Sequence, residues 1–214
     1  MRFNIIATGS KGNAIIVNDK ILIDCGVSFT KLKEYYKNIQ LVLLTHIHGD
    51  HFNKTTIRTL GQQRPTLRFG CCEWLVNDLV ECGISKKNID VLEVGTIYNF
   101  NICKVSPLLL YHNVPQCGYR IFIEDKKMIY ATDTNTLEGI SAKNYDYYLI
   151  EANYTEEGIK ERIEAKELLG LYVYEYESME NHLSKEKCDE FITNNKKDDS
   201  EYYYMHCHVE RIGG

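Results

Sequence analysis

The sequence contains no long apolar run and no signal for export. No stretch approaches the roughly 20 apolar residues that a transmembrane helix needs. The first segment, MRFNIIATGSKGNA, lacks a basic region followed by an apolar core, as a secretory signal would have. These two absences predict a cytoplasmic protein with no membrane partner.

Positive charge is also scarce, with 25 lysines and arginines against 30 aspartates and glutamates, for a net charge of −5. No global positive field draws in nucleic acid or an anionic membrane. The charge balance argues against a tight, sequence-independent DNA-binding protein but leaves open an enzyme that touches phosphates locally. The eight cysteines form no CxxC pair, so we expect reduced and mostly buried thiols.

The apolar fraction of 44% and the charged fraction of 26% are those of an ordinary globular protein, and 214 residues can bury one large core. We therefore predict a single domain over residues 1–214. Apolar periodicity predicts helices at residues 29–37, 71–82, 156–169 and 184–194. Short apolar runs predict strands at residues 3–7, 13–17, 20–24, 40–45, 145–150 and 201–205, with several more between 89 and 132. Strand-rich halves that are each closed by helices predict a four-layered αββα sandwich.

Three of the seven histidines stand within six residues, in the stretch LLTHIHGDHF at 43–52. Residues two apart in an extended segment point to the same side, so His46 and His48 can reach one ion. Gly49 permits a sharp turn that brings Asp50 and His51 towards a neighbouring position. Imidazole and carboxylate together suit Zn²⁺, Mn²⁺ or Fe²⁺, with zinc the default. The pattern predicts a metal site.

Further candidates stand where predicted strands end. His112, Asp133 and His206 each follow an apolar strand, and His182 lies in the turn-like segment ENHLS before a helix. One edge of a sandwich could collect all four. The end of a strand fixes the backbone of His206, as a metal ligand requires, whereas His182 is placed by a loop, where substrate-handling groups commonly lie.

The motif THIHGDH, followed by His112, Asp133 and His206, resembles the metallo-β-lactamase superfamily over nearly the whole chain. The resemblance implies an αββα sandwich with two divalent metal ions, zinc or alternatively manganese. It implies that His46, His48 and His112 hold the first ion. It further implies that Asp50, His51 and His206 hold the second ion, with Asp133 bridging the two.

Three shorter segments resemble one subgroup. TGSKGNA after the first strand, EANY at 151–154 and NHLS at 181–184 are similar to the small YycJ-type proteins, which are exonuclease-like relatives of ribonuclease Z. Tyr154 and Thr155 depart from this subgroup, which has His-Asp at these positions. The resemblance implies a nucleic-acid or nucleotide substrate, and dimers are common among such relatives, so a homodimer is a candidate assembly.

Two cations about 3.5–4 Å apart lower the pKa of a shared water and clamp the attacking and leaving oxygens of a displacement. In this scheme Asp50 is catalytic because it orients the attacking group, and His182 is catalytic because it contacts phosphate or protonates the leaving group. The loop GSKGN can turn backbone N–H groups towards a ligand, and Lys11 adds a cation. We predict substrate contacts at a set of five residues: Ser10, Lys11, Asn13, Asn153 and His182.

We therefore predict a dinuclear metal-dependent hydrolase, most simply a phosphodiesterase acting on nucleic acid. The alternatives are a phosphodiesterase of small or cyclic nucleotides, a lactone or thioester hydrolase, and a binding protein with a degenerate site. Asp133 stands where β-lactamases of the superfamily have cysteine. Thioester hydrolases of the glyoxalase type have a C-terminal helical region after the last ligand, whereas eight residues follow His206 here.

Overall fold

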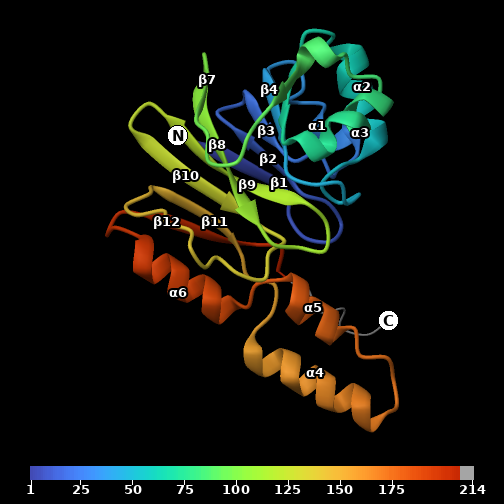
Figure 1. The fold of residues 1–214 in the computed structure, drawn as a ribbon, viewed down its shortest axis with the longest axis vertical. Helices are drawn as coiled ribbons and strands as arrows, with labels where there is room; N and C mark the ends of the chain where they lie inside the picture. The colour runs from blue at the N-terminus through green and yellow to red at the C-terminus, as the bar shows by residue number, and fades with distance from the viewer. Residues whose placement is uncertain (208–214) are drawn as a thin grey trace.

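The structure, a computed structural model, describes residues 1–207. Two six-stranded sheets stack face to face, and helices cover the outer side of each sheet (Figure 1). The predicted αββα sandwich is confirmed. Among the described residues, no helix is both long and apolar enough to cross a membrane.

The first sheet is built by the first half of the chain in sequence order. Its first three strands are antiparallel, and the strands from β3 onwards run parallel. The six strands are β1 (Phe3–Ala7), β2 (Ala14–Val17), β3 (Ile21–Ile23), β4 (Leu41–Leu44), β5 (Arg68–Cys71) and β6 (Ile89–Val91).

The second sheet has the order β12-β11-β10-β9-β8-β7. Strands β7 to β10 are antiparallel neighbours, and β10, β11 and β12 are parallel. The six strands are β7 (Tyr98–Phe100), β8 (Cys103–Leu110), β9 (Gln116–Ile123), β10 (Lys126–Ala131), β11 (Tyr147–Glu151) and β12 (Glu201–Met205).

Central strands are apolar on both faces because both faces are covered. In β4, Leu41 and Leu43 point into the core between the sheets, while Val42 and Leu44 pack under the helices of the first sheet. This is the period of two that a pleated strand imposes. In β10, Tyr130 likewise faces the inter-sheet core and Ile129 faces the outer layer. All eight cysteines are free and seven are buried, as predicted.

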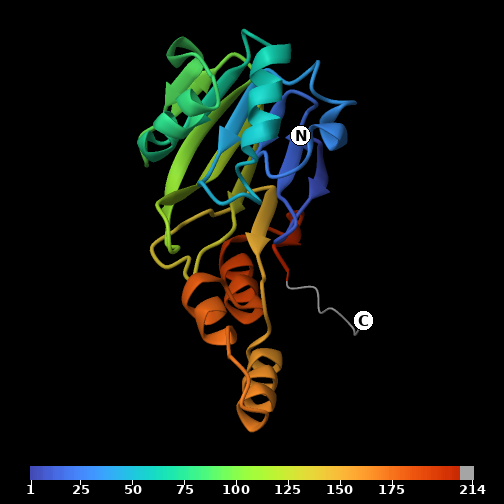
Figure 2. The same cartoon turned by 90° about the vertical axis from the view of Figure 1, so that its right-hand side faces the viewer.

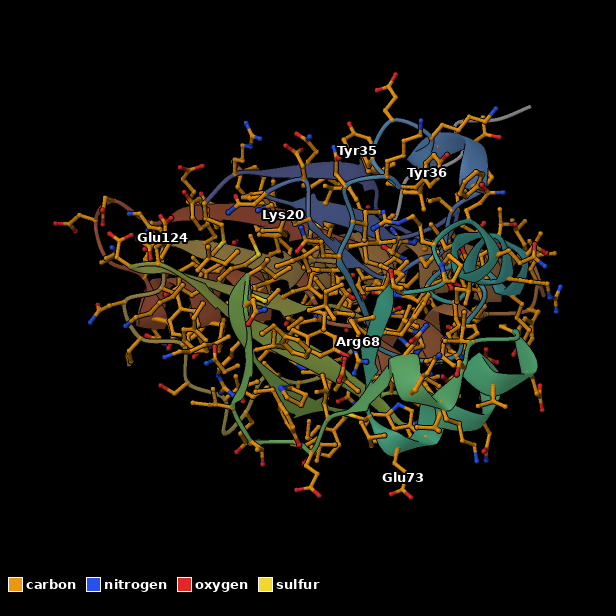
Figure 3. The ribbon with its side chains drawn as sticks, turned by 90° about the horizontal axis from the view of Figure 1, so that it is seen from above. Lys20, Tyr35, Tyr36, Arg68, Glu73 and Glu124 are labelled. Carbon is orange, nitrogen blue, oxygen red and sulfur yellow. The ribbon has the colours of Figure 1, made fainter. Side chains whose placement is uncertain are left out.

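Three helices and two short 3₁₀ turns cover the first sheet. The helices are α1 (Phe29–Leu32), α2 (Lys54–Gln63) and α3 (Val76–Glu81), and the 3₁₀ turns span Glu73–Leu75 and Lys86–Asn88. Figure 3 shows Tyr35 and Tyr36 near α1 at one margin of this layer and Glu73 at the opposite margin.

Two helix predictions in this half are wrong in extent, and one helix was not predicted. The helix predicted over residues 29–37 ends at Leu32, because the chain turns so that the buried Ile39 can lead into β4. The helix predicted from residue 71 starts later, because Cys71 is the last residue of β5. Helix α2 escaped prediction because only Ile57 and Leu60 give it an apolar stripe, although Asn53 caps it by accepting a hydrogen bond from the Thr56 amide.

The remaining helices are α4 (Glu156–Leu168), α5 (Glu175–Asn181) and α6 (Lys185–Asn195). Helix α6 packs on the second sheet, and the Ser184 hydroxyl caps it by accepting from the Lys187 amide, as predicted. Helices α4 and α5 with their connecting loop, residues 156–181, form a segment that we call the arm. Figure 2 shows α4 extending away from the sandwich.

Strand direction explains where the site lies. Strands β10, β11 and β12 are parallel, and β8 runs in the same direction because two antiparallel pairings separate it from β10. Their carboxyl ends therefore meet at one edge of the second sheet. Strands β3 and β4 are also parallel and deliver the motif at 45–51 from the first sheet. Polar residues that are scattered in sequence are thus collected at one end of the sandwich.

At the opposite ends of these strands, Asp146 is a buried polar anchor. Its carboxylate accepts hydrogen bonds from Lys127 N at 2.8 Å, Lys126 Nζ at 3.0 Å and Lys197 Nζ at 2.9 Å. Burial by itself would raise the pKa of Asp146, but these three donors outweigh it and hold the pKa well below its usual range. The charged form is therefore the form that stabilises the fold.

We predict that Asp146→Asn lowers the free energy of unfolding by about 1.5–3 kcal/mol at pH 7, the range for hydrogen bonds to a charged group. Because the pKa is depressed on folding, the contribution is complete above the unfolded value of about 3.9 and is lost as pH falls below it. Urea unfolding at pH 7 and pH 3 should show the difference between wild type and variant shrinking in acid. Asp199→Asn is the control, since Asp199 contacts the same Lys197 at 3.4 Å but is 70% exposed, and it should change stability by less than about 0.5 kcal/mol. A difference at pH 3 as large as at pH 7 would contradict the assignment.

Candidate active site

The loop after β4 folds back so that its polar residues face one point. The amides of His51 and Phe52 both donate to His48 O, at 2.8 and 2.7 Å, and close a tight turn. The Cys25 amide then donates to His51 O at 2.8 Å, which ties the turn to the end of β3. Gly26 is required here, because a Cβ at this position would lie 1.6 Å from Asp50 O.

The structure brings His46, His48 and His112 into one group whose potential ligand atoms lie within 4.8 Å of one another. His112 Nε2 is 3.3 Å from His48 Nδ1, and the other His112 nitrogen donates to Asn181 O at 3.0 Å. His46 Nδ1 is 3.0 Å from Thr45 Oγ1, while its Nε2 is buried without a hydrogen-bond partner. Burial lowers the pKa of His46 and of His112, which favours neutral imidazoles, the form that binds metals.

A second group contains Asp50, His51, Asp133 and His206, again with potential ligand atoms within 4.8 Å. Asp133 Oδ2 lies 3.0 Å from His51 Nε2, and the other Asp133 oxygen lies 3.0 Å from His206 Nδ1. Asp50 Oδ2 faces His51 Nε2 at 3.7 Å and His206 Nε2 at 3.6 Å. Asp133 Oδ2 is buried and takes part in no hydrogen bond, although His51 Nε2 is close to it. This oxygen and the nearby imidazole nitrogens are therefore available to a cation.

Asp24 lies behind His51 and was not among the predicted site residues. It is fully buried, and its Oδ2 is 2.7 Å from His51 Nδ1. Thr45 N and Thr45 Oγ1 donate to the other oxygen, and Tyr130 OH donates to Oδ2 at 3.0 Å. A carboxylate on one nitrogen of a ligand histidine fixes its tautomer and presents the other nitrogen to a metal. The only sequence signal was an aspartate at the end of the strand KILID.

Glu151 plays the corresponding part on the other sheet and was likewise not predicted. It is fully buried at the end of β11, and its Oε1 lies 2.6 Å from His182 Nδ1 and 3.3 Å from His206 Nδ1. The amide of Thr134 donates to Oε2 at 2.9 Å. Glu151 also belongs to a third group that could hold a metal, with Asp133, His182 and His206. Because Glu151 occupies Nδ1 of His182, the other nitrogen of His182 is left for a ligand.

The carboxylates give this end of the sandwich a negative potential. Burial opposes protonation of His206, yet Asp133 and Glu151 together raise its pKa to about 10. His51 behaves in the same way: burial lowers its pKa, but Asp133 and Asp24 outweigh burial and raise it well above the ordinary value. A site that draws protons onto buried imidazoles also favours cations, and a metal ion would replace those protons.

These observations fit a pair of divalent cations. The donors are imidazole nitrogens and carboxylate oxygens, and two of these atoms, His46 Nε2 and Asp133 Oδ2, are buried without a hydrogen-bond partner. In four histidines the Nδ1 atom is already in contact with another group: Thr45 for His46, Asp24 for His51, Asn181 for His112 and Glu151 for His182. All seven predicted ligands lie in the first two groups. His182 lies beside them, with its ring centroid 5.2 Å from that of His112 and 5.2 Å from that of His206.

The predicted substrate-binding residues are placed less uniformly. A cavity of about 270 Å³ at the site is lined by residues that include Ser10, Asp50, His182 and His206. Lys11 is exposed and does not line this cavity. Asn13 is buried, with Nδ2 2.8 Å from His51 Nε2, and Asn153 donates to His206 O at 3.0 Å. Asn13 and Asn153 therefore contact the predicted metal ligands His51 and His206. Contact of the substrate with the five predicted residues stays a prediction.

A larger cavity of about 1190 Å³ lies elsewhere. Its lining includes Arg2, Lys20, Phe100 and Glu124, and it contains none of the histidines or predicted ligands. By size alone this cavity would be the candidate active site, but histidines and carboxylates that could bind a metal line the smaller cavity.

A family model described as a beta-lactamase superfamily domain matches residues 19–169. The chain belongs to the metallo-β-lactamase superfamily. Members of this superfamily are mostly metal-dependent hydrolases, and the histidine and aspartate groups described above are of the kind that binds divalent metals. The matched segment contains the motif at 46–51, His112, Asp133 and Glu151, while His182 and His206 lie beyond it.

Solved structures support the fold of this superfamily member. The metallo-β-lactamase fold protein YhfI from Bacillus subtilis is similar with a TM-score of 0.74 and 16% identity, over 97% of this chain and 86% of the other. The short form of human tRNase Z gives 0.69 and 17%, over 97% and 92%. A diphosphatase of the PhnP family gives 0.68 and 15%, over 96% and 85%. No match was found among curated proteins. At these identities the likeness shows the fold and leaves the substrate open.

We predict that the protein binds close to two transition-metal ions per chain after reconstitution with Zn²⁺ or Mn²⁺, because seven suitable ligands exceed the needs of one ion. His206→Ala should lose or loosen one ion, whereas His182→Ala should keep both. Elemental analysis of the three proteins tests this. A wild-type content that stays below one ion per chain, or loss of metal from the His182 variant alone, would contradict the assignment.

We further predict that Asp24→Asn weakens metal binding about 10- to 100-fold, the usual effect of removing a partner of a ligand histidine. Competition with a chromogenic chelator measures the affinity, and circular dichroism checks that the variant folds. Tyr130→Phe is the matched control, since it removes one hydrogen bond to the same carboxylate and leaves the contact with His51. Equal affinities for wild type and a folded Asp24→Asn would show that Asp24 does not position His51.

Proposed function

We propose that this chain is a metal-dependent phosphodiesterase that acts on nucleic acid or on nucleotides. The observation that carries the proposal is the pair Glu151 and His182 beside two groups of potential metal ligands. When bound, two divalent ions would activate a water and neutralise charge on the phosphate oxygens. The protein must supply the rest: orientation of the attacking water, and a proton for the leaving oxygen.

Asp50 is suited to the first task. Its side chain is 22% exposed, whereas that of Asp133 is 2% exposed, so Asp50 is the carboxylate of the second group that can also meet solvent and substrate. Its Oδ2 is within 3.6–3.7 Å of two imidazoles and can accept a hydrogen bond from the attacking water.

His182 is suited to the second task. Its side chain is 19% exposed and lines the cavity, while Glu151 accepts a hydrogen bond from Nδ1 at 2.6 Å. A buried carboxylate in this position fixes the direction of the imidazole and turns its other nitrogen towards the cavity, the orientation that a general acid requires. Alkoxide leaving groups of phosphodiesters need that proton.

The comparisons also support a phosphate-based substrate over a lactone or thioester. Two of the similar structures are named as a tRNase and a diphosphatase, which are both enzymes that cleave bonds to phosphate. We further propose that the metal is zinc, that the substrate is a nucleic acid or a nucleotide, and that the protein forms a homodimer.

We predict that the metal-loaded protein hydrolyses phosphodiesters, that a chelator abolishes the activity, and that Zn²⁺ or Mn²⁺ restores it. Asp50→Ala should reduce turnover at least about 10²-fold. Hydrolysis of bis(4-nitrophenyl) phosphate, followed by absorbance, gives the rate. Near-normal turnover of Asp50→Ala would refute its role, and cleavage restricted to lactones or thioesters would replace the phosphodiesterase with an ester hydrolase.

The role of His182 can be separated from metal binding. A 4-nitrophenolate leaving group needs little protonation, whereas the alkoxide of a dinucleotide needs it. We therefore predict that His182→Ala loses about 10²-fold or more on the dinucleotide, much less on bis(4-nitrophenyl) phosphate, and keeps its metal content. Equal losses on both substrates would show that His182 does not act as the general acid.

A further inference from the structure

The arm, residues 156–181, forms one wall of the catalytic cavity. Helix α5 and the residue before it contribute Tyr174, Glu177, Ser178 and Asn181 to the lining. The end of α5 is fixed to the site by two contacts: Asn181 O accepts from His112, and Glu180 O accepts from Asn135 Nδ2 at 2.7 Å. The arm thus contacts one of the predicted ligands directly, and its side chains lie where a substrate must enter.

Tyr174 is an aromatic residue held in place at this entrance. Lys166 Nζ lies 3.5 Å from the centroid of its ring, a cation–π contact between α4 and the start of α5. Lys166 is fixed in turn by the buried Glu175, whose Oε1 is 2.8 Å away. Tyr174 is 41% exposed and lines the cavity. A ring positioned in this way can stack on a planar group, as nucleobases stack on aromatic side chains.

The charge of the arm is strongly one-sided. Residues 156–181 contain eight glutamates and three basic residues, a net charge of −5. The whole chain also has a net charge of −5, so the other 22 acidic and 22 basic residues cancel. Among the described residues that line the cavity, Asp50, Asp133 and Glu177 are acidic and no lysine or arginine is present. Long nucleic acids are held by basic residues along their phosphates, and this entrance offers the opposite charge.

We propose that the arm selects nucleotide-sized phosphodiesters: Tyr174 stacks on one nucleobase next to the scissile phosphate, and the acidic charge of the arm disfavours longer polyanions. This inference rests on the proposed phosphodiesterase activity and narrows its substrate. The cavity of about 270 Å³ lies just below the lower limit of about 300 Å³ for pockets that bind drug-sized ligands, so it has room for a small substrate and not for several nucleotide units.

Two substrates that share one leaving group test the role of Tyr174. Thymidine 5′-(4-nitrophenyl phosphate) and methyl 4-nitrophenyl phosphate both release 4-nitrophenolate and differ only in the nucleoside. The metal-loaded wild type should prefer the thymidine ester in kcat/KM. Tyr174→Ala should reduce that preference about 5- to 100-fold, mainly through KM, the effect of losing one stacked base. Tyr174→Phe keeps the ring and should keep the preference.

The outcomes separate the two proposals. If the wild type hydrolyses neither ester, the phosphodiesterase itself is refuted. If it hydrolyses both but shows no preference, or if Tyr174→Ala keeps the preference, stacking is refuted while the phosphodiesterase stands. Equal losses on both esters in Tyr174→Ala would assign Tyr174 a structural role and would also overturn the stacking.

A charge variant tests the second half of the inference. Glu161, Glu164 and Glu180 are exposed on the arm and do not line the cavity. Changing all three to glutamine should raise cleavage of a 20-nucleotide single-stranded DNA relative to the thymidine ester by at least about threefold at 50 mM salt. Raising salt to 200 mM should have the same effect on the wild type, because screening weakens the repulsion.

The matched control changes three exposed glutamates elsewhere to glutamine: Glu34, Glu73 and Glu124. This control has the same change in net charge and should leave the ratio unaltered. An equal increase in the control would assign the effect to net charge and overturn the role of the arm. A ratio that falls with salt, as for a protein with a basic nucleic-acid groove, would also overturn it.

Discussion

The buried carboxylate of Asp24 joins the two sheets and the site in one hydrogen-bond network. It stands at the end of β3 and receives hydrogen bonds from Thr45 after β4 and from Tyr130 of β10, while its remaining contact orients His51. A polar group at this depth would be strongly unfavourable without hydrogen-bond partners, and Thr45, Tyr130 and His51 supply them. The same group therefore links the two sheets and orients a potential metal ligand.

Glu151 plays the same part at the end of a strand of the second sheet. Asp24 and Glu151 together show which residues of the site could be predicted from the sequence and which could not. The potential metal ligands could be predicted because their spacing, as in the motif at 46–51, and their positions after apolar strands have a clear chemical meaning. Asp24 and Glu151 occupy equivalent strand ends, but a single carboxylate beside an apolar run has no such signal. Their role depends on which strands become neighbours, and that is a property of the tertiary structure.

The same distinction applies to the helices. Helices α4 and α6 have polar caps followed by good helix-forming residues, and both were predicted close to their observed bounds. Helix α5 was not predicted because its sequence, EYESMEN, has no apolar stripe, and Glu175 is buried beside two basic residues of α4, Lys166 and Arg162. Tertiary contacts, which include this ion pairing and the hydrogen bonds to Asn181 O and Glu180 O, place the helix at the cavity, and local periodicity does not.

Charge balance connects the buried network with the arm. Asp24, Asp50, Asp133 and Glu151 bring four carboxylates to the site, which equals the charge of two divalent cations. With such ions bound, the site would carry little excess positive charge, so its attraction would be confined to the phosphate directly in contact with them. At physiological salt, charges more than about 8 Å apart are largely screened from one another, so a substrate responds mainly to the charges on the nearest surface. Next to this cavity, that surface is the acidic arm. For the proposed phosphodiesterase, such a site would attract one phosphodiester strongly and its neighbours along a chain weakly, which is the electrostatic condition for a small substrate.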